Sequence, residues 1–144
     1  VLVESFGEWR PFPDTVPALT GLKSRFKLAI LSNVDDDLFQ LSQRHLKVPF
    51  DWVVTSEQLG SYKPSEHNFR SAQRIIGAPS SQHLHVAQSR YHDIAPAQAL
   101  GLRTVWVNRR GARSTPATEC EPDLEVPDLQ TLAGLMPPAP REIR

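Results

Sequence analysis

Five short apolar runs recur along the chain, separated by more polar segments. We predict that these runs form strands: "KLAILS" at 27–32, "DWVVTS" at 51–56, "HLHVAQ" at 83–88, "RTVWVN" at 103–108 and "DLEV" at 123–126. A continuous apolar run is typical of a strand covered on both faces, as in a parallel sheet. The run at 27–32 is therefore expected to be buried on both faces.

Helix signals lie before, between and after these runs. The predicted helices cover 14–26, 33–46, 63–77, 92–101 and 127–136. Asp14 is placed to cap the first helix, and the acidic run 35–37 falls in the first turn of the second, where the helix dipole favours negative charge. Pro64 lies near the start of the third helix, and Gly77 stops it.

The order of these elements indicates the fold class. Strands that alternate with helices are joined by right-handed crossovers, which give a parallel sheet with helices on both faces. The length of 144 residues fits one such domain. The sequence therefore predicts a three-layer, Rossmann-like α/β fold with a parallel sheet.

Composition narrows the classes of partner. The chain has 16 basic and 16 acidic residues, so no charge excess favours nucleic acid or an anionic membrane surface. It contains no apolar run of the roughly 20 residues that span a bilayer, and no signal peptide is recognisable. A single cysteine, Cys120, excludes an internal disulfide and is compatible with a reducing compartment, so we expect a cytoplasmic protein.

Polar residues gather after the predicted strands, where sheets of this kind bind ligands. Ser32 and Asn33 end the first strand, Lys63 follows the second, and Ser89 and Asp93 follow the third. Each has an ordinary interpretation as a helix cap or a surface charge. Because the carboxyl ends of parallel strands lie at one edge of the sheet, we expect the five side chains to meet there.

Two other polar features have modest interpretations. His83 and His85 alternate along a strand and share one face, which would suit a metal pair. No third ligand with suitable spacing accompanies them, so half-buried strand residues are favoured. Cys120 has no recognisable partner base and is interpreted as a loop cysteine rather than a nucleophile.

Three short motifs in order carry a family resemblance. Ser32-Asn33 ends an apolar strand, "YKP" with Lys63 opens a helix, and "AQSRYHD" ends in Asp93. Together they resemble the haloacid dehalogenase superfamily, and within it the type II branch of L-2-haloacid dehalogenase-like proteins. The resemblance covers about 8–136, and "GLRTVWVNR" and "PDLEVPDL" are also similar to this branch.

The resemblance implies a hydrolase in which an aspartate attacks the substrate and water then hydrolyses the resulting ester. Lys63 would hold the attacking carboxylate and stabilise the charge that develops nearby. Asp93 would orient Lys63 or the hydrolytic water. Ser32, Asn33 and Ser89 would bind a small anionic substrate.

The fourth motif bears on the choice of chemistry. Magnesium-dependent relatives carry a further acid before the matched aspartate, whereas residues 87–89 are Ala-Gln-Ser. This favours dehalogenation of a small 2-haloacid without a cofactor over a phosphatase, which would need Mg²⁺. Two departures leave the substrate open: Arg90 stands where dehalogenases have asparagine, and Phe69 stands where they tend to have tyrosine.

The family's first motif, an apolar strand that ends in the nucleophilic aspartate, has no counterpart in the sequence, and neither has most of the helical cap. We therefore expect an N-terminally truncated chain that is inactive alone. Its expected parts are a remnant of the cap-to-core linker at 1–12, a core domain at 13–136 and a disordered Pro-rich tail at 137–144.

In the family the missing strand lies between those at 27–32 and 83–88, and three outcomes are open. A longer protein supplies the strand, the two flanking strands pair directly, or another chain fills the gap, as in a homo-oligomer joined through sheet edges. A non-catalytic, partner-binding α/β module is the alternative to an enzyme. A response-regulator-like or nucleotide-binding domain is disfavoured because the sequence has no Gly-rich phosphate loop and no acid pair at its first strand end.

Overall fold

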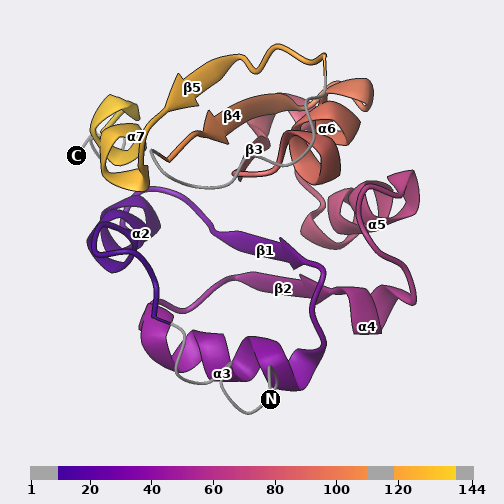
Figure 1. Cartoon of the computed structure of the whole chain (residues 1–144), viewed down its shortest axis with the longest axis horizontal. Helices are drawn as coiled ribbons and strands as arrows, with labels where there is room; N and C mark the ends of the chain where they lie inside the picture. Colours follow the sequence, from indigo (N-terminus) through magenta and orange to yellow (C-terminus); the bar gives the residue numbers. More distant parts are fainter. Residues whose placement is uncertain (1–9, 110–118, 139–144) are drawn as a thin grey trace, which may run out of the picture.

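A computed structural model describes residues 10–109 and 119–138 of the chain and has the predicted α/β fold (Figure 1). The strands are β1 (Ala29–Ser32), β2 (Trp52–Thr55), β3 (Leu84–Ala87), β4 (Arg103–Val107) and β5 (Leu124–Val126). The helices are α2 (Thr15–Lys23), α3 (Asp36–Leu46), α4 (Ser56–Leu59), α5 (Glu66–Ile76), α6 (Ala95–Ala99) and α7 (Leu129–Leu135), with a 3₁₀ turn η1 (Ser80–Gln82) and a π-helical turn η2 (Arg90–Ile94).

Every predicted strand and helix has its counterpart, with ends shifted by a few residues. α5 begins two residues after Pro64 and ends at Ile76, directly before Gly77, whose φ of 71° lies in the left-handed region that glycine tolerates. Most of the predicted linker remnant at 1–12 and of the predicted tail at 137–144 lies outside the described residues. None of the described helices has the length and apolar character required to cross a membrane.

The strands are parallel but form two separate sheets. β1 pairs with β2, with Ile30 opposite Val53, while β3, β4 and β5 form the second sheet in that order. β1 and β3 do not pair, so direct closure of the gap, one of the three expected outcomes, is wrong for this structure. Within the part of the chain that is described, no strand lies between them.

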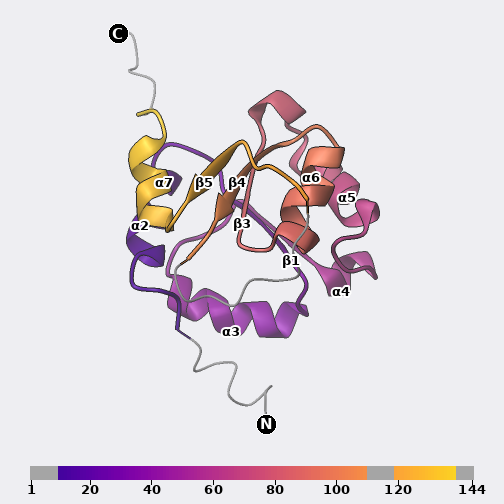
Figure 2. The ribbon, with the colours of Figure 1, turned by 45° about the horizontal axis from the view of Figure 1, so that its top comes forward.

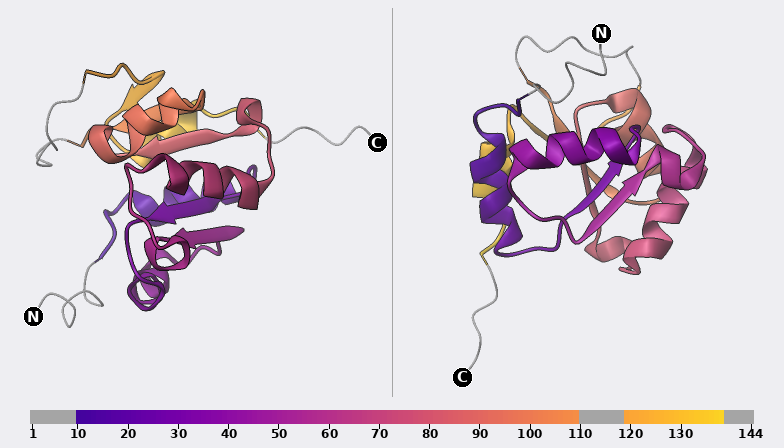
Figure 3. Two further views of the ribbon diagram at one scale, coloured as in Figure 1. Left: turned by 90° about the vertical axis from the view of Figure 1, so that its right-hand side faces the viewer. Right: turned by 90° about the horizontal axis from the view of Figure 1, so that it is seen from below.

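Helices cover both sides of the strands. α2 and α7 lie together on one side, and α5 and α6 lie on the other (Figure 2). α3 runs alongside β2, on the side away from β1 (Figures 1 and 3). This three-layer arrangement directs the carboxyl ends of β1 and β2 toward the loops that precede α3 and α5.

Each sheet contributes to a different apolar cluster. Val105, Val107, Val126 and Leu132 join β4 and β5 to α7, and Leu84 and Val86 pack against them. A second cluster places Phe69, Ala97 and Leu102 beneath Leu31. β1 itself is less buried than its sequence predicts, because Ala29 is exposed and the next three residues are only half-buried. Its edge toward β3 has no neighbouring strand, which accounts for the difference.

The expected capping role of Asp14 is also wrong. Asp14 precedes α2, but its side chain makes no capping hydrogen bond there. Its carboxylate instead accepts hydrogen bonds from the Arg109 guanidinium at 2.8 and 3.2 Å and from the Leu129 N–H at 2.9 Å. Asp14 thus connects the start of α2 with the end of β4 and the start of α7.

Candidate active site

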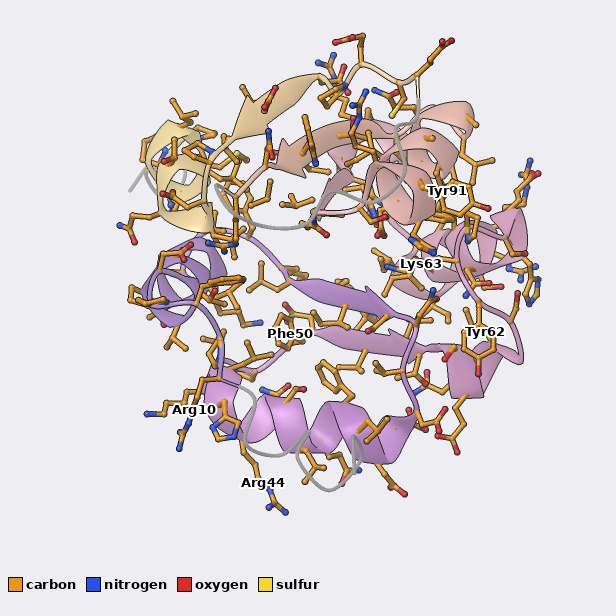
Figure 4. All side chains as sticks on the ribbon, viewed as in Figure 1. Arg10, Arg44, Phe50, Tyr62, Lys63 and Tyr91 are labelled. Atoms are coloured by element: carbon orange, nitrogen blue, oxygen red, sulfur yellow. The ribbon has the colours of Figure 1, made fainter. Side chains whose placement is uncertain are left out.

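Lys63 and Asp93 form a buried ion pair on the carboxyl side of the strands. Lys63 Nζ lies 2.6 Å from Asp93 Oδ1, and the two side chains are only 11% and 8% exposed. Lys63 comes from the loop between α4 and α5, and Asp93 from the π-helical turn after β3. Figure 4 shows Lys63 near the carboxyl end of β1, in the space between the two sheets.

Asn33 holds the backbone of Lys63. The Lys63 N–H donates to Asn33 Oδ1 at 2.7 Å, and Asn33 Nδ2 donates to the Lys63 carbonyl at 3.1 Å. Asn33 directly follows β1, so these two bonds join the loop that carries Lys63 to the end of a strand. The side chain that the sequence assigns to substrate binding therefore also positions the lysine.

The two predicted serines lie differently. The Ser32 side chain is half-buried and makes no hydrogen bond with another described residue. The Ser89 hydroxyl accepts from the His92 N–H and lies 3.0 Å from His92 Nδ1, and the Ser89 carbonyl accepts from the Asp93 N–H. Ser89 thus shapes the turn that presents Asp93. Hydrogen bonds join Asn33 to Lys63 and Lys63 to Asp93. Ser89 reaches this group only through its backbone, and the Ser32 side chain makes no hydrogen bond to it.

His85 completes the cluster, although the sequence does not identify it as a site residue. Its Nε2 lies 2.9 Å from Asp93 Oδ1, the same oxygen that Lys63 contacts. Its only signal in the sequence is an imidazole within a largely apolar strand, which indicates a polar contact but does not identify Asp93 as the partner. A buried polar ring requires a hydrogen-bond partner, and the partner here is a carboxylate.

Burial alone would raise the pKa of the Asp93 carboxyl group, because a buried site disfavours the charged form. The hydrogen bond to His85, the positive charges of Lys63 and His85 and the hydrogen bond to Lys63 outweigh that effect, so the pKa of Asp93 lies below its usual value. Asp93 is therefore an ionised acceptor at neutral pH.

A cavity of about 650 Å³ lies between the two sheets. Residues 29–31 of β1 and 84–87 of β3 form opposite walls, and Lys63 and Asp93 also line it. Its remaining walls are largely apolar side chains from the helices on both faces. A largely apolar cavity between the unpaired edges of β1 and β3 is thus lined by a buried ion pair.

Arg90 is held away from this pair. Its guanidinium lies 4.9 Å from the centre of the Trp106 ring and donates to the Cys120 carbonyl at 2.6 Å. Cys120 is a half-buried free cysteine. The arginine that departs from the dehalogenase pattern is therefore engaged with β4 and the segment that precedes β5.

The residues near Asp93 do not by themselves fit a Mg²⁺ site. Magnesium takes oxygen ligands, and carboxylates are the main ones in proteins. Asp93 Oδ1 already contacts the Lys63 ammonium and the His85 imidazole. In residues 10–109 and 119–138, no group of three or more His, Cys, Asp or Glu side chains is arranged to hold a metal.

Comparisons with known proteins indicate the family of this chain. Residues 3–107 match the family model for haloacid dehalogenase-like hydrolases. Glyceraldehyde 3-phosphate phosphatase of Methanothermobacter thermautotrophicus is 33% identical over 109 residues, which cover 72% of this chain and 47% of the relative. (S)-2-haloacid dehalogenase of Pseudomonas sp. strain YL is 29% identical over 137 residues, which cover 93% of this chain and 58% of the relative.

Similarity extends to solved structures. A crystal structure of an L-2-haloacid dehalogenase has a TM-score of 0.80 and 30% sequence identity, and the match covers 90% of this chain and 57% of that one. The chain spans about half the length of the curated relatives it matches.

Proposed function

Because the chain belongs to the haloacid dehalogenase-like hydrolase family, we propose that it forms the charge-stabilising part of a hydrolase site for a small anionic substrate. The reaction that we propose is hydrolytic dehalogenation of a small 2-haloacid. The Lys63–Asp93 pair at the cavity between the sheets is the observation that carries this proposal. A buried ammonium fixed at a cavity wall is suited to stabilise a negative charge that develops there.

The attacking carboxylate must come from elsewhere than Asp93. Asp93 is the only carboxylate in contact with Lys63 among the described residues, and its Oδ1 is already shared by two donors. We propose that an acidic residue at the end of a strand seated between β1 and β3 supplies the nucleophile. The open edges of two parallel sheets support this, because unpaired backbone groups at a sheet edge favour addition of a strand.

In the proposed reaction the carboxylate oxygen forms a bond to the substrate carbon as the carbon–halogen bond breaks, and halide leaves with the bonding electron pair. Water then attacks the ester carbonyl, which releases the 2-hydroxy acid, a proton and the original carboxylate. Lys63 stabilises the carboxylate and the tetrahedral intermediate. Asp93 holds Lys63 in place and orients the water.

The substrate's own carboxylate is proposed to bind Ser32, Asn33 and Ser89 at the carboxyl ends of β1 and β3. The hydroxyl of Ser32 is available for this, since no described residue engages it. Tyr62 directly precedes Lys63, and Tyr91 lies two residues before Asp93. They are 62% and 47% exposed and lie on the same side of the molecule as Lys63 (Figure 4). No cofactor is part of this proposal.

Phosphate-ester hydrolysis is the second candidate function. Its support is the similarity to an archaeal phosphatase at 33% identity over 109 residues, against 29% over 137 residues for the Pseudomonas sp. strain YL dehalogenase. This reaction would use Mg²⁺, with acidic ligands from the same supplied strand. The single Cys120 suits a cytoplasmic location for either enzyme.

The test is complementation. The 144-residue chain is mixed or co-expressed with the segment of the Pseudomonas sp. strain YL dehalogenase that the match leaves uncovered. Halide release from 2-haloacids and phosphate release from small phosphomonoesters are measured with and without Mg²⁺. We expect metal-independent halide release from the mixture, none from the chain alone, and loss of activity in Lys63→Ala.

Three results would contradict the proposal. Turnover by the chain alone would mean that it already holds its nucleophile, and turnover that survives Lys63→Ala would remove the lysine from the mechanism. Phosphate release that depends on Mg²⁺, without halide release, would favour the second candidate. Light scattering on the chain alone tests whether a second copy of the chain, and not an added segment, fills the gap between the two sheets. A stable dimer would indicate that it does.

A further inference from the structure

His85 lies in the middle of β3, on the face that packs against α5 and η2. Its neighbours Leu84 and Val86 point to the opposite face, where they join the apolar cluster of β4, β5 and α7. The His85 side chain is only 12% exposed. A polar ring at such a depth is costly unless its nitrogen atoms are hydrogen-bonded, so its partner is informative.

The partner of His85 is the carboxylate of the candidate site. Its Nε2 donates to Asp93 Oδ1 at 2.9 Å, and Lys63 Nζ reaches the same oxygen at 2.6 Å. No described residue donates to Asp93 Oδ2. Asp93 Oδ1 therefore accepts from two donors, whereas Oδ2 accepts from none among the described residues. Asp93 itself lines the cavity.

Phe69 fixes the plane of the imidazole. The two rings meet edge to face with their centres 5.3 Å apart, and Phe69 itself is 1% exposed. Phe69 is the position at which the family resemblance leads us to expect a tyrosine. A phenyl ring donates no hydrogen bond, so Phe69 cannot supply the donor that a tyrosine would offer. The two side-chain donors to Asp93 among the described residues are Lys63 and His85.

His83 shows that this contact is particular to His85. It lies two residues earlier on the same face and is also half-buried, but its Nδ1 has no hydrogen-bond partner among the described residues. Burial, and to a smaller degree the charge of His85, lower the pKa of His83. A half-buried histidine at the start of this strand therefore does not automatically bond to a carboxylate.

We propose that His85 is a positioning residue of the hydrolytic site, which fixes the Asp93 carboxylate so that Oδ1 holds Lys63 and Oδ2 faces the reacting groups. Without the imidazole the carboxylate turns about its Cβ–Cγ bond, and the ammonium of Lys63 moves with it. The inference rests on the proposed function for what Lys63 and Asp93 do. The position of the Asp93 carboxylate, by contrast, depends only on residues of this chain and can be measured without turnover.

The first test uses the 144-residue chain alone. The Asp93 side-chain carboxyl is titrated by ¹³C NMR in the wild type and in His85→Leu, His85→Gln and His83→Leu. Gln places an N–H donor at the same number of bonds from Cα as Nε2 of histidine. Thermal unfolding of each variant establishes that it is folded.

His85→Leu is expected to raise the pKa of Asp93 toward its ordinary value and to change the ¹³C shift of the carboxyl at neutral pH. His85→Gln should restore the neutral-pH shift toward that of the wild type, and His83→Leu should leave both quantities unchanged. If His85→Leu leaves both unchanged while folded, or if His83→Leu has the same effect, His85 does not position Asp93. If His85→Leu does not fold, His85→Ala takes its place, and an unchanged pKa and carboxyl shift of Asp93 in that folded variant would equally overturn the proposal.

The second test uses the complemented enzyme and separates the two proposals. We expect kcat in His85→Leu to fall roughly 10- to 100-fold with little change in KM, because a displaced charge acts on the transition state more than on substrate binding. His85→Gln should recover most of that loss. An unchanged kcat alongside a changed Asp93 titration would overturn the role in the reaction. Absence of any turnover in the complemented wild type would instead count against the proposed function.

Discussion

Asn33 and Lys63 are joined by two reciprocal hydrogen bonds between a side-chain amide and a backbone. The Asn33 amide accepts from the Lys63 N–H at 2.7 Å and donates to the Lys63 carbonyl at 3.1 Å. Two residues 30 positions apart in the chain are thereby fixed to each other at the end of β1. Lys63 in turn reaches Asp93, so one strand end organises the charged pair.

Asn33→Ala should therefore loosen the loop that carries Lys63. Loss of two partly buried hydrogen bonds is expected to lower the free energy of unfolding by about 1–2 kcal/mol. Urea unfolding at pH 7 measures it. Ser32→Ala is the matched control, since the Ser32 hydroxyl makes no hydrogen bond with a described residue, and should stay within about 0.5 kcal/mol of wild type. Equal effects of the two substitutions would contradict the positioning role of Asn33.

Asp93 should make stability depend on pH. Its pKa is lowered in the folded chain from the ordinary value of 3.8, so its stabilising contribution is present above pH 3.8 and is lost as the pH falls through the lower folded value. The difference in unfolding free energy between wild type and Asp93→Asn is therefore expected to be largest near pH 7 and to shrink below 3.8. Urea unfolding over this pH range measures the difference. A difference that is constant with pH would show that the charge of Asp93 does not contribute.

Asp14 should matter for stability although it does not cap α2. Asp14→Asn removes an anionic partner from Arg109 and weakens the bond to the Leu129 N–H, at an expected cost of about 1–3 kcal/mol. Asp128→Asn is the control, because Asp128 caps α7 through the Thr131 N–H and asparagine is an equally good cap. Thermal unfolding of both variants at pH 7 compares them. A larger effect at Asp128 would contradict the linking role of Asp14.

Addition of a strand should protect the open sheet edges from hydrogen exchange. In the chain alone, the backbone amides of β1 and β3 that point into the cavity should exchange faster than those bonded to β2 and β4. After the complementing segment binds, these same amides should slow, whereas the amides of β5 should not change. Protection confined to helices would show that the segment binds elsewhere.

The sequence predicts the elements well because apolar runs and helix ends are local signals. The valines of "WVV" and "VWV" form strands as expected, and Gly77 ends α5. The open edge of β1 is not a local property, since it depends on which strand lies beside it. Likewise, the capping role expected for Asp14 is overridden by Arg109, which lies 95 residues away in the chain.

The candidate site could be predicted only in part. Motif order brings Asn33, Lys63 and Asp93 to one edge, where their contacts are found. His85 could not be assigned from the sequence, because an alternating pair of histidines in a strand has no partner until the π-helical turn returns Asp93 to it. The contacts of Arg90 with Trp106 and Cys120 are equally invisible to a local pattern.

A single turnover of a 2-haloacid by the complemented chain in H₂¹⁸O, followed by mass spectrometry of its peptides, identifies the carboxylate that attacks the substrate. Water that attacks the ester carbonyl leaves one ¹⁸O atom in the carboxylate that served as nucleophile. We expect the label in an aspartate of the added segment and no label in Asp93 or any other acid of the 144 residues. Label in Asp93, or product that contains ¹⁸O with no label in either polypeptide, would contradict the account.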